Sequence, residues 1–206
     1  MSGAFPISSA KFETLGIKSI QTTIISKSDS GKRLARQVDG QRWGFTASII
    51  TSTRSSVYGE LMAFIIKQRS GKETFTIIPP EIEDARGNET GTILVDGVHA
   101  VGDTTIDLDG FAGDGAGRFL AGDFISFNSH SKVYMIVADV TSSSNAATVT
   151  IEPPLTTALA NNGAVTYDNV PFTVYLTSDL QEFGTAGADK DGNLLYKYEM
   201  DVEESL

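Results

Sequence analysis

Alternating apolar and polar positions predict β-strands over much of the chain. Residues 16–27 (GIKSIQTTIISK) are rich in Ile and Thr, which favour strands. In residues 43–49 every second residue is apolar, so a strand there places these side chains on one face of a sheet. They are Trp43, Phe45, Ala47 and Ile49. The clearest alternation, in residues 194–202 (LLYKYEMDV), predicts a strand that pairs with the N-terminal sheet.

One segment has helical periodicity and predicts a helix near residues 55–70. Its apolar positions follow the spacing i, i+4, i+7 and i+8 and are Val57, Leu61, Phe64 and Ile65. Ser55 or Ser56 is expected to cap the N-terminus, and Gly71 is expected to end the helix in the left-handed conformation. We expect the helix to pack on the strand that contains Trp43. The candidate core residues are Trp43, Phe45, Leu61, Phe64 and Ile65.

The N-terminal region carries two further signals. Residues 1–13 have no clear period and are expected to form an arm that is ordered only where it docks. Residues 28–31 (SDSG) predict a turn, and a basic strand region, KRLARQ at 32–37, follows it.

Polar segments divide the chain into a host and an insert. The stretch 81–91 (EIEDARGNETG) marks one boundary, and a second falls near 167–170. Between them lie short strand-like runs separated by Gly, Asn, Asp and Ser, which is typical of a small barrel or sandwich. We therefore predict a mainly β protein. Its host domain (1–89 and 170–206) is a sandwich or barrel with one helix, and residues 90–169 form an inserted small β-barrel.

Charge is unevenly distributed along the chain. The net charge is −10, yet residues 1–80 hold eleven basic and five acidic residues, while residues 81–206 hold five and twenty-one. This segregation favours complementary surfaces within one subunit or between subunits; alternatively, the loop-rich segments simply contain more Asp. An acidic chain argues against sequence-specific DNA binding, because phosphate neutralisation needs Lys and Arg.

Candidate chemistry is sparse. The chain has no cysteine and only two histidines, which excludes disulfides, thiolate sites and a three-histidine metal site. His99 and His130 lie beside small polar residues and are expected to be solvated. Four aspartates around a glycine-rich loop could hold calcium, but turn formation is the favoured interpretation; they are Asp107, Asp109, Asp114 and Asp123. We predict no catalytic residue, cofactor or metal, and no apolar run is long enough to predict a membrane span.

The order of parts resembles the distal tail protein family of long-tailed bacteriophages, in the form with an inserted oligonucleotide/oligosaccharide-binding-like (OB-like) barrel. QRWGFTAS leads into a helix with YGELMAFIIKQRSG, and the strand ETFTIIPP follows. A β-module then contains FLAGDFISFNSHSKVYMIVADV and ATVTIEPPL, before the terminal strand. In that family a W/Y-G-hydrophobic strand, a helix with a Lys/Arg-Gly end and a strand ending in Pro occur in this order. The resemblance covers nearly the whole chain and rests on order, since no single motif is specific.

The resemblance implies a structural protein of the virion, made in the host cytoplasm, that forms a homohexameric ring. The ring joins the tail tube to the baseplate hub or tail tip, and DNA passes through it without specific binding. Its implied partners are the tail tube protein and the hub or tail-tip proteins. The inserted barrel lies at the periphery, within reach of tail fibres or host saccharide. The candidate subunit-interface residues are Lys32, Arg33 and Arg36, which can meet an acidic surface of a neighbour.

Two other classes of function remain open. A tail tube or tail terminator ring protein is favoured if residues 90–169 belong to the main sheet. A carbohydrate-binding module or glycan-active enzyme requires exposed aromatic residues in a groove, whereas the pattern around Trp43 is typical of a core residue.

Overall fold

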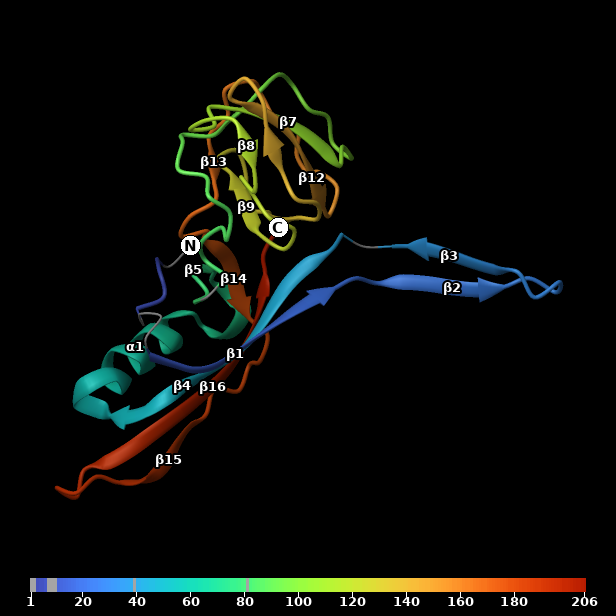
Figure 1. Cartoon of the computed structure of the whole chain (residues 1–206). Helices are drawn as coiled ribbons and strands as arrows, with labels where there is room; N and C mark the ends of the chain where they lie inside the picture. The colour runs from blue at the N-terminus through green and yellow to red at the C-terminus, as the bar shows by residue number, and fades with distance from the viewer. Residues whose placement is uncertain (1–2, 7–10, 39, 81) are drawn as a thin grey trace.

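The computed structural model describes residues 3–6, 11–38, 40–80 and 82–206 and has a mainly β architecture with one α-helix (Figure 1). A sandwich-like host domain carries the helix, and a separate six-stranded sheet forms a nearly closed barrel. The predicted fold class is therefore confirmed. We call the barrel the module.

The host sheet is antiparallel, and the C-terminal strand lies near its centre. Its order is β1-β4-β16-β14-β5, and β15 also pairs with β16. The strands are β1 (Phe12–Ile20), β4 (Arg42–Thr53), β5 (Phe75–Ile77), β14 (Phe172–Leu176), β15 (Phe183–Ala188) and β16 (Leu194–Glu204). The alternation predicted from the sequence is present over part of β4 and β16. Trp43, Phe45, Ala47 and Ile49 of β4 and Tyr198, Met200 and Val202 of β16 are buried in the host core, whereas Leu194 at the start of β16 is 55% exposed.

Residues at the N-terminus cover the edge of β5. The backbone N–H of Phe5 donates to the carbonyl of Thr76 at 2.7 Å, and that of Thr76 donates to the carbonyl of Gly3 at 3.1 Å. The N-terminal segment 1–13 thus docks through residues 3–6, while its residues 1–2 and 7–10 lie outside the described residues.

The helix differs from the prediction at both ends. A π-helical turn, η2 (Arg54–Tyr58), leads directly into α1 (Gly59–Lys67), so the serines expected as caps lie inside the turn and make no cap hydrogen bond. After the helix, Arg69 and Ser70 adopt positive φ values of 54° and 62°, not Gly71. Gly71 instead lies in the 3-10 turn η3 (Ser70–Lys72), where an added Cβ would come within 2.6 Å of the Leu176 carbonyl oxygen.

The candidate core residues lie in one apolar cluster, and the rings of Phe64 and Trp43 also contact segments that the sequence did not predict. Trp43, Phe45, Leu61 and Ile65 are buried, whereas Phe64 is only partly buried. The ring of Phe64 lies 5.8 Å from that of Phe5 and 5.4 Å from that of Phe75, so the helix packs against the docked N-terminal segment. The ring of Trp43 instead packs edge-to-face on Phe124 of the module, at 5.2 Å.

The module has its own sheet and its own core. The sheet order is β13-β9-β10-β12-β7-β6. The strands are β6 (Leu94–Val95), β7 (Thr105–Asp109), β9 (Phe124–Phe127), β10 (Val133–Ile136), β12 (Ala146–Glu152) and β13 (Val165–Thr166), and a small pair is formed by β8 (Gly115–Ala116) and β11 (Thr141–Ser142). The buried apolar side chains of these strands form a core of their own, except for Phe124 and Val133, whose side chains belong to the host core. The module therefore contributes directly to the packing of the host.

Truncation of Phe64 tests the aromatic contact with the N-terminal segment. We expect Phe64→Ala to lower the free energy of unfolding by about 2 kcal/mol, less than for a fully buried phenylalanine, because the ring is partly exposed. In a Phe5→Ala background the same change should cost about 1 kcal/mol less, since the aromatic pair is already lost. Urea unfolding followed by fluorescence of the single tryptophan measures both values.

The control is Ile66→Ala, which removes a side chain that is 67% exposed on the same helix and should change stability little. Strictly additive effects of Phe5→Ala and Phe64→Ala would contradict the contact.

Candidate assembly surface

Two strands leave the host sheet and form a projecting ribbon, which we call the arm (Figure 1). The strands are β2 (Thr23–Lys27) and β3 (Arg33–Gln37), which pair with each other only. The backbone N–H of Gly31 donates to the carbonyl of Ser28 at 2.8 Å, so the predicted turn is present. The predicted single strand over residues 16–27 is wrong, because β1 ends at Ile20 and the arm begins beyond it.

The arm exposes apolar side chains on both of its faces. All ten strand residues are exposed. Ile24 and Ile25 are consecutive, so they point to opposite faces, and they are 60% and 54% exposed. Leu34 and Val38 are also more than half exposed. A two-stranded ribbon is at best marginally stable by itself in water, and exposed apolar residues of this kind are candidates for contact with a partner.

The candidate interface residues Lys32, Arg33 and Arg36 all lie exposed on the arm. Lys27 lies directly opposite Arg33 in the ribbon, and Arg36 lies opposite Ile24. Like charges directly opposite each other destabilise an antiparallel pair. An acidic surface placed against this part of the arm would relieve that repulsion.

The face of the host sheet opposite the core is polar. On β16 the exposed charged residues are Lys197, Glu199 and Asp201, which alternate with the buried ones, and Leu194 at the start of the strand is also exposed. The Asp201 carboxylate accepts hydrogen bonds from the Thr46 hydroxyl and from Lys18 Nζ, the latter at 3.0 Å. These two hydrogen bonds lower the pKa of Asp201, so its carboxylate stays ionised to a lower pH than an ordinary aspartate.

Three of the four aspartates around the glycine-rich loop have structural partners, whereas Oδ1 of Asp109 is buried and has no hydrogen-bond partner in the described residues. Asp123 accepts from the backbone N–H of Leu120 and from Arg86, and Asp114 accepts from the backbone N–H of Asn145. Within the described ranges, no three His, Asp or Glu residues are close enough to hold a metal ion. Both histidines were expected to be solvated, and this is wrong. His99 is 9% exposed and accepts from the backbone N–H of Asp107, and His130 is half-buried against the Tyr134 hydroxyl.

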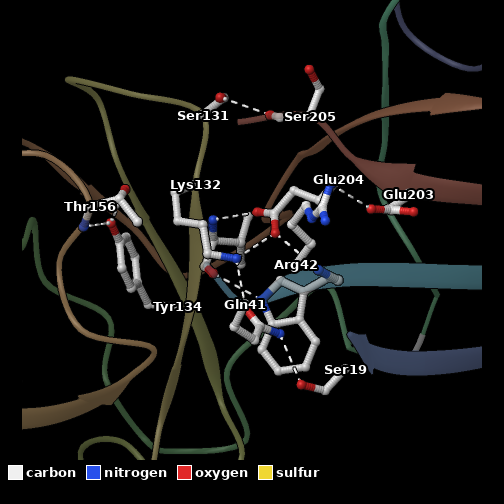
Figure 2. Close-up of polar contacts among 12 residues, drawn as sticks. Ser19, Gln41, Arg42, Ser131, Lys132, Tyr134, Thr156, Glu203, Glu204 and Ser205 are labelled. Carbon is white, nitrogen blue, oxygen red and sulfur yellow. Dashed lines mark hydrogen bonds and ion pairs between the residues drawn. The ribbon is translucent and has the colours of Figure 1, made fainter. Parts of the chain in front are cut away.

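At the root of the arm, side chains from three distant segments meet in a buried polar cluster (Figure 2). Gln41 lies just before β4, and its amide donates to Ser19 Oγ at 3.1 Å and accepts from Lys132 Nζ at 2.8 Å. Lys132 Nζ also donates to the Glu204 carboxylate in an ion pair whose two side chains are at most 1% exposed. We call Gln41, Trp43, Lys132 and Glu204 the junction cluster.

Backbone groups complete the junction cluster. The Glu204 carboxylate accepts from the backbone N–H of Trp43 at 3.0 Å and of Val133 at 2.8 Å. The indole N–H of Trp43 donates to the Val133 carbonyl at 2.9 Å. Burial lowers the pKa of Lys132 and raises that of Glu204, while the attraction between the two groups opposes both shifts. The interactions that favour the charged forms of Lys132 and Glu204 therefore come from protein groups and not from water.

Sequence reasoning missed the junction cluster, although one signal was present. In β16 the buried positions are Tyr198, Met200, Val202 and Glu204. When the next position in a series of buried apolar residues is a carboxylate, that carboxylate is expected to have a buried partner of opposite charge. No local pattern could identify that partner as Lys132, which lies in the module.

The sequence matches no protein-family model and no curated protein. In the part of the chain that the structure describes, no helix has the length and apolar character needed to cross a membrane.

Removing one member of the buried ion pair should be strongly destabilising. We expect Glu204→Gln or Lys132→Met alone to lower the free energy of unfolding by about 3–5 kcal/mol, because each leaves a buried charge without its counter-charge. The double variant Lys132→Met/Glu204→Gln should be more stable than either single variant. Urea unfolding of the four proteins gives the coupling energy directly.

The matched control is the exposed pair Lys18–Asp201, for which Lys18→Met should cost at most about 1 kcal/mol. Equal stability losses for the buried and the exposed pair would overturn the assignment.

Proposed function

We propose that this chain is a distal tail protein of a long-tailed bacteriophage. It is a structural virion protein without catalytic activity that forms a ring of six, joins the tail tube to the baseplate hub or tail tip, and lets DNA pass. The observation that carries the proposal is the arm, a ribbon whose strand residues are all exposed and include apolar and basic side chains. The order of the host strands, helix and inserted barrel supports it.

The arm supports assembly with further copies of the same chain. It projects away from its own host domain and module, so it does not lie on their surfaces (Figure 1). Residues 81–206 carry sixteen more acidic than basic residues, and the arm is basic, so a second copy offers a surface of complementary charge. A projecting element that docks on a different surface of its neighbour makes a heterologous contact, which closes into a ring when the rotation allows.

Two observations favour this function over the alternatives. The described strands of residues 90–169 form a sheet of their own, whereas the tail tube or terminator alternative requires them in the main sheet. The carbohydrate-binding alternative requires exposed aromatic residues, but Trp43 is 6% exposed, and none of the large apolar side chains exposed in the described residues is aromatic.

We propose that the polar face of the host sheet lines the lumen of the ring. The charged residues Lys197, Glu199 and Asp201 of β16 are exposed on this face, so this part of it can border water. Its carboxylates repel phosphate, which suits a channel that DNA passes without binding.

Charge reversal on the arm tests the proposal. The monomer of the triple variant Lys32→Glu, Arg33→Glu and Arg36→Glu should have a free energy of unfolding within about 0.5 kcal/mol of that of the parent, because all three residues are exposed. The same variant should lose the ring, measured as oligomeric mass by light scattering and as rings in negative-stain images. Salt at 1 M should weaken the parent ring as well, since the Debye length falls to about 3 Å.

The control reverses three exposed lysines outside the arm, Lys67, Lys72 and Lys190, and changes the net charge equally. If the oligomeric mass responds to neither salt nor arm reversal, the interface is not the arm. A parent protein that is monomeric in solution and absent from purified tails would refute the function as a whole, as would glycan hydrolysis by the purified chain.

A further inference from the structure

Two chain segments connect the module to the host, one between β5 and β6 and the other between β13 and β14. A connection of this kind would by itself leave an inserted domain free to reorient. We infer that the junction cluster is a latch that holds the module in one orientation on the host sheet. The inference concerns the single chain and does not depend on the proposed ring.

The latch joins three separate parts of the protein. Gln41 belongs to the root of the arm, where it bridges Ser19 of β1 to Lys132. Lys132 comes from the connection between β9 and β10 in the module, and Glu204 is the last residue of β16. The Ser131 hydroxyl adds a hydrogen bond to the carbonyl of Ser205 at 3.2 Å, so the module and the C-terminus are joined at two consecutive positions (Figure 2).

Hydrogen-bond geometry gives the latch its specificity. Glu204 accepts from one backbone N–H of the host, at Trp43, and from one of the module, at Val133. A displacement of the module by a few ångströms would separate these donors from the carboxylate and leave Lys132 buried without its counter-charge. Unpaired buried charges and backbone N–H groups are costly, so neighbouring orientations are strongly disfavoured.

An apolar seal lies beside the latch and keeps water out of it. Phe124 of the module contacts Trp43 at 5.2 Å and Phe172 of the host at 5.7 Å between ring centroids. Lys132 Nζ lies 5.7 Å from the centre of the Trp43 ring, a cation–π contact that places the ammonium between the polar and apolar parts of the junction. An apolar contact alone tolerates sliding, whereas the polar groups fix the register.

The orientation can be measured with two spin labels, since the chain has no native cysteine. Cysteines replace Val98 on a module loop and Ile66 on α1, which are 79% and 67% exposed. Labelled protein is diluted with excess unlabelled protein, so that each assembly contains one labelled copy. We expect a single narrow distance distribution in the otherwise unchanged chain. The double variant Lys132→Met/Glu204→Gln should lose this single peak and give a broad distribution, while its module retains native strand content.

Gln41→Ala gives a second measurement that does not remove a charge. This variant should increase hydrogen exchange at the backbone N–H groups of Trp43 and Val133, and leave exchange within the module strand β12 unchanged. Lys18→Met, at an exposed ion pair on the polar face of the host sheet, is the matched control and should change neither readout. A broad distribution in the parent, or an unchanged narrow peak and unchanged exchange in both junction variants, would overturn the latch.

Discussion

The pairing of Lys132 with Glu204 in a space closed to water is the interaction on which the arrangement of the whole chain depends. It brings together a module residue and the end of the central host strand, and it lies next to the only tryptophan. Burying both charges is unfavourable unless each finds its partner and the remaining hydrogen bonds are made. The structure meets this condition with one side-chain amide and two backbone N–H groups. In the latch that we propose, host and module are joined as one rigid body and not as two domains on a linker.

The arm and the junction cluster have opposite physical characters although they are adjacent in the chain. The arm presents apolar and basic side chains to solvent, where they gain stability only from a partner. The junction cluster begins at Gln41, immediately after the arm, and has all its polar groups satisfied inside the protein. The exposed arm thus begins directly beside the buried junction cluster. In a ring, this cluster would fix the direction in which the arm reaches its neighbour and the position at which the module is displayed.

The sequence predicted what depends on local periodicity and failed where distant segments decide the structure. The alternation around Trp43 and in residues 194–202 placed two central strands correctly, because the buried phase of a strand is visible in the strand itself. The departure of the arm at Ile20 was not visible, since residues 16–27 have continuous strand propensity. The partner of Phe64 was missed for a similar reason, because Phe5 reaches the helix only after the N-terminal segment docks on β5. The buried pair joins residues 72 positions apart, beyond any local pattern.

The central position of β16 affects the order in which the chain can fold during synthesis. Val202 of β16 faces Phe45 of β4, and the intervening chain includes the helix and the entire module. The host sheet cannot close until β16 has left the ribosome, whereas all strands of the module sheet are synthesised before β14 and β16. Pairings of such large sequence separation are slow to form. A chain that stops before β16 would thus lack both the central strand of the host sheet and Glu204, so it would present the arm from an incomplete host domain.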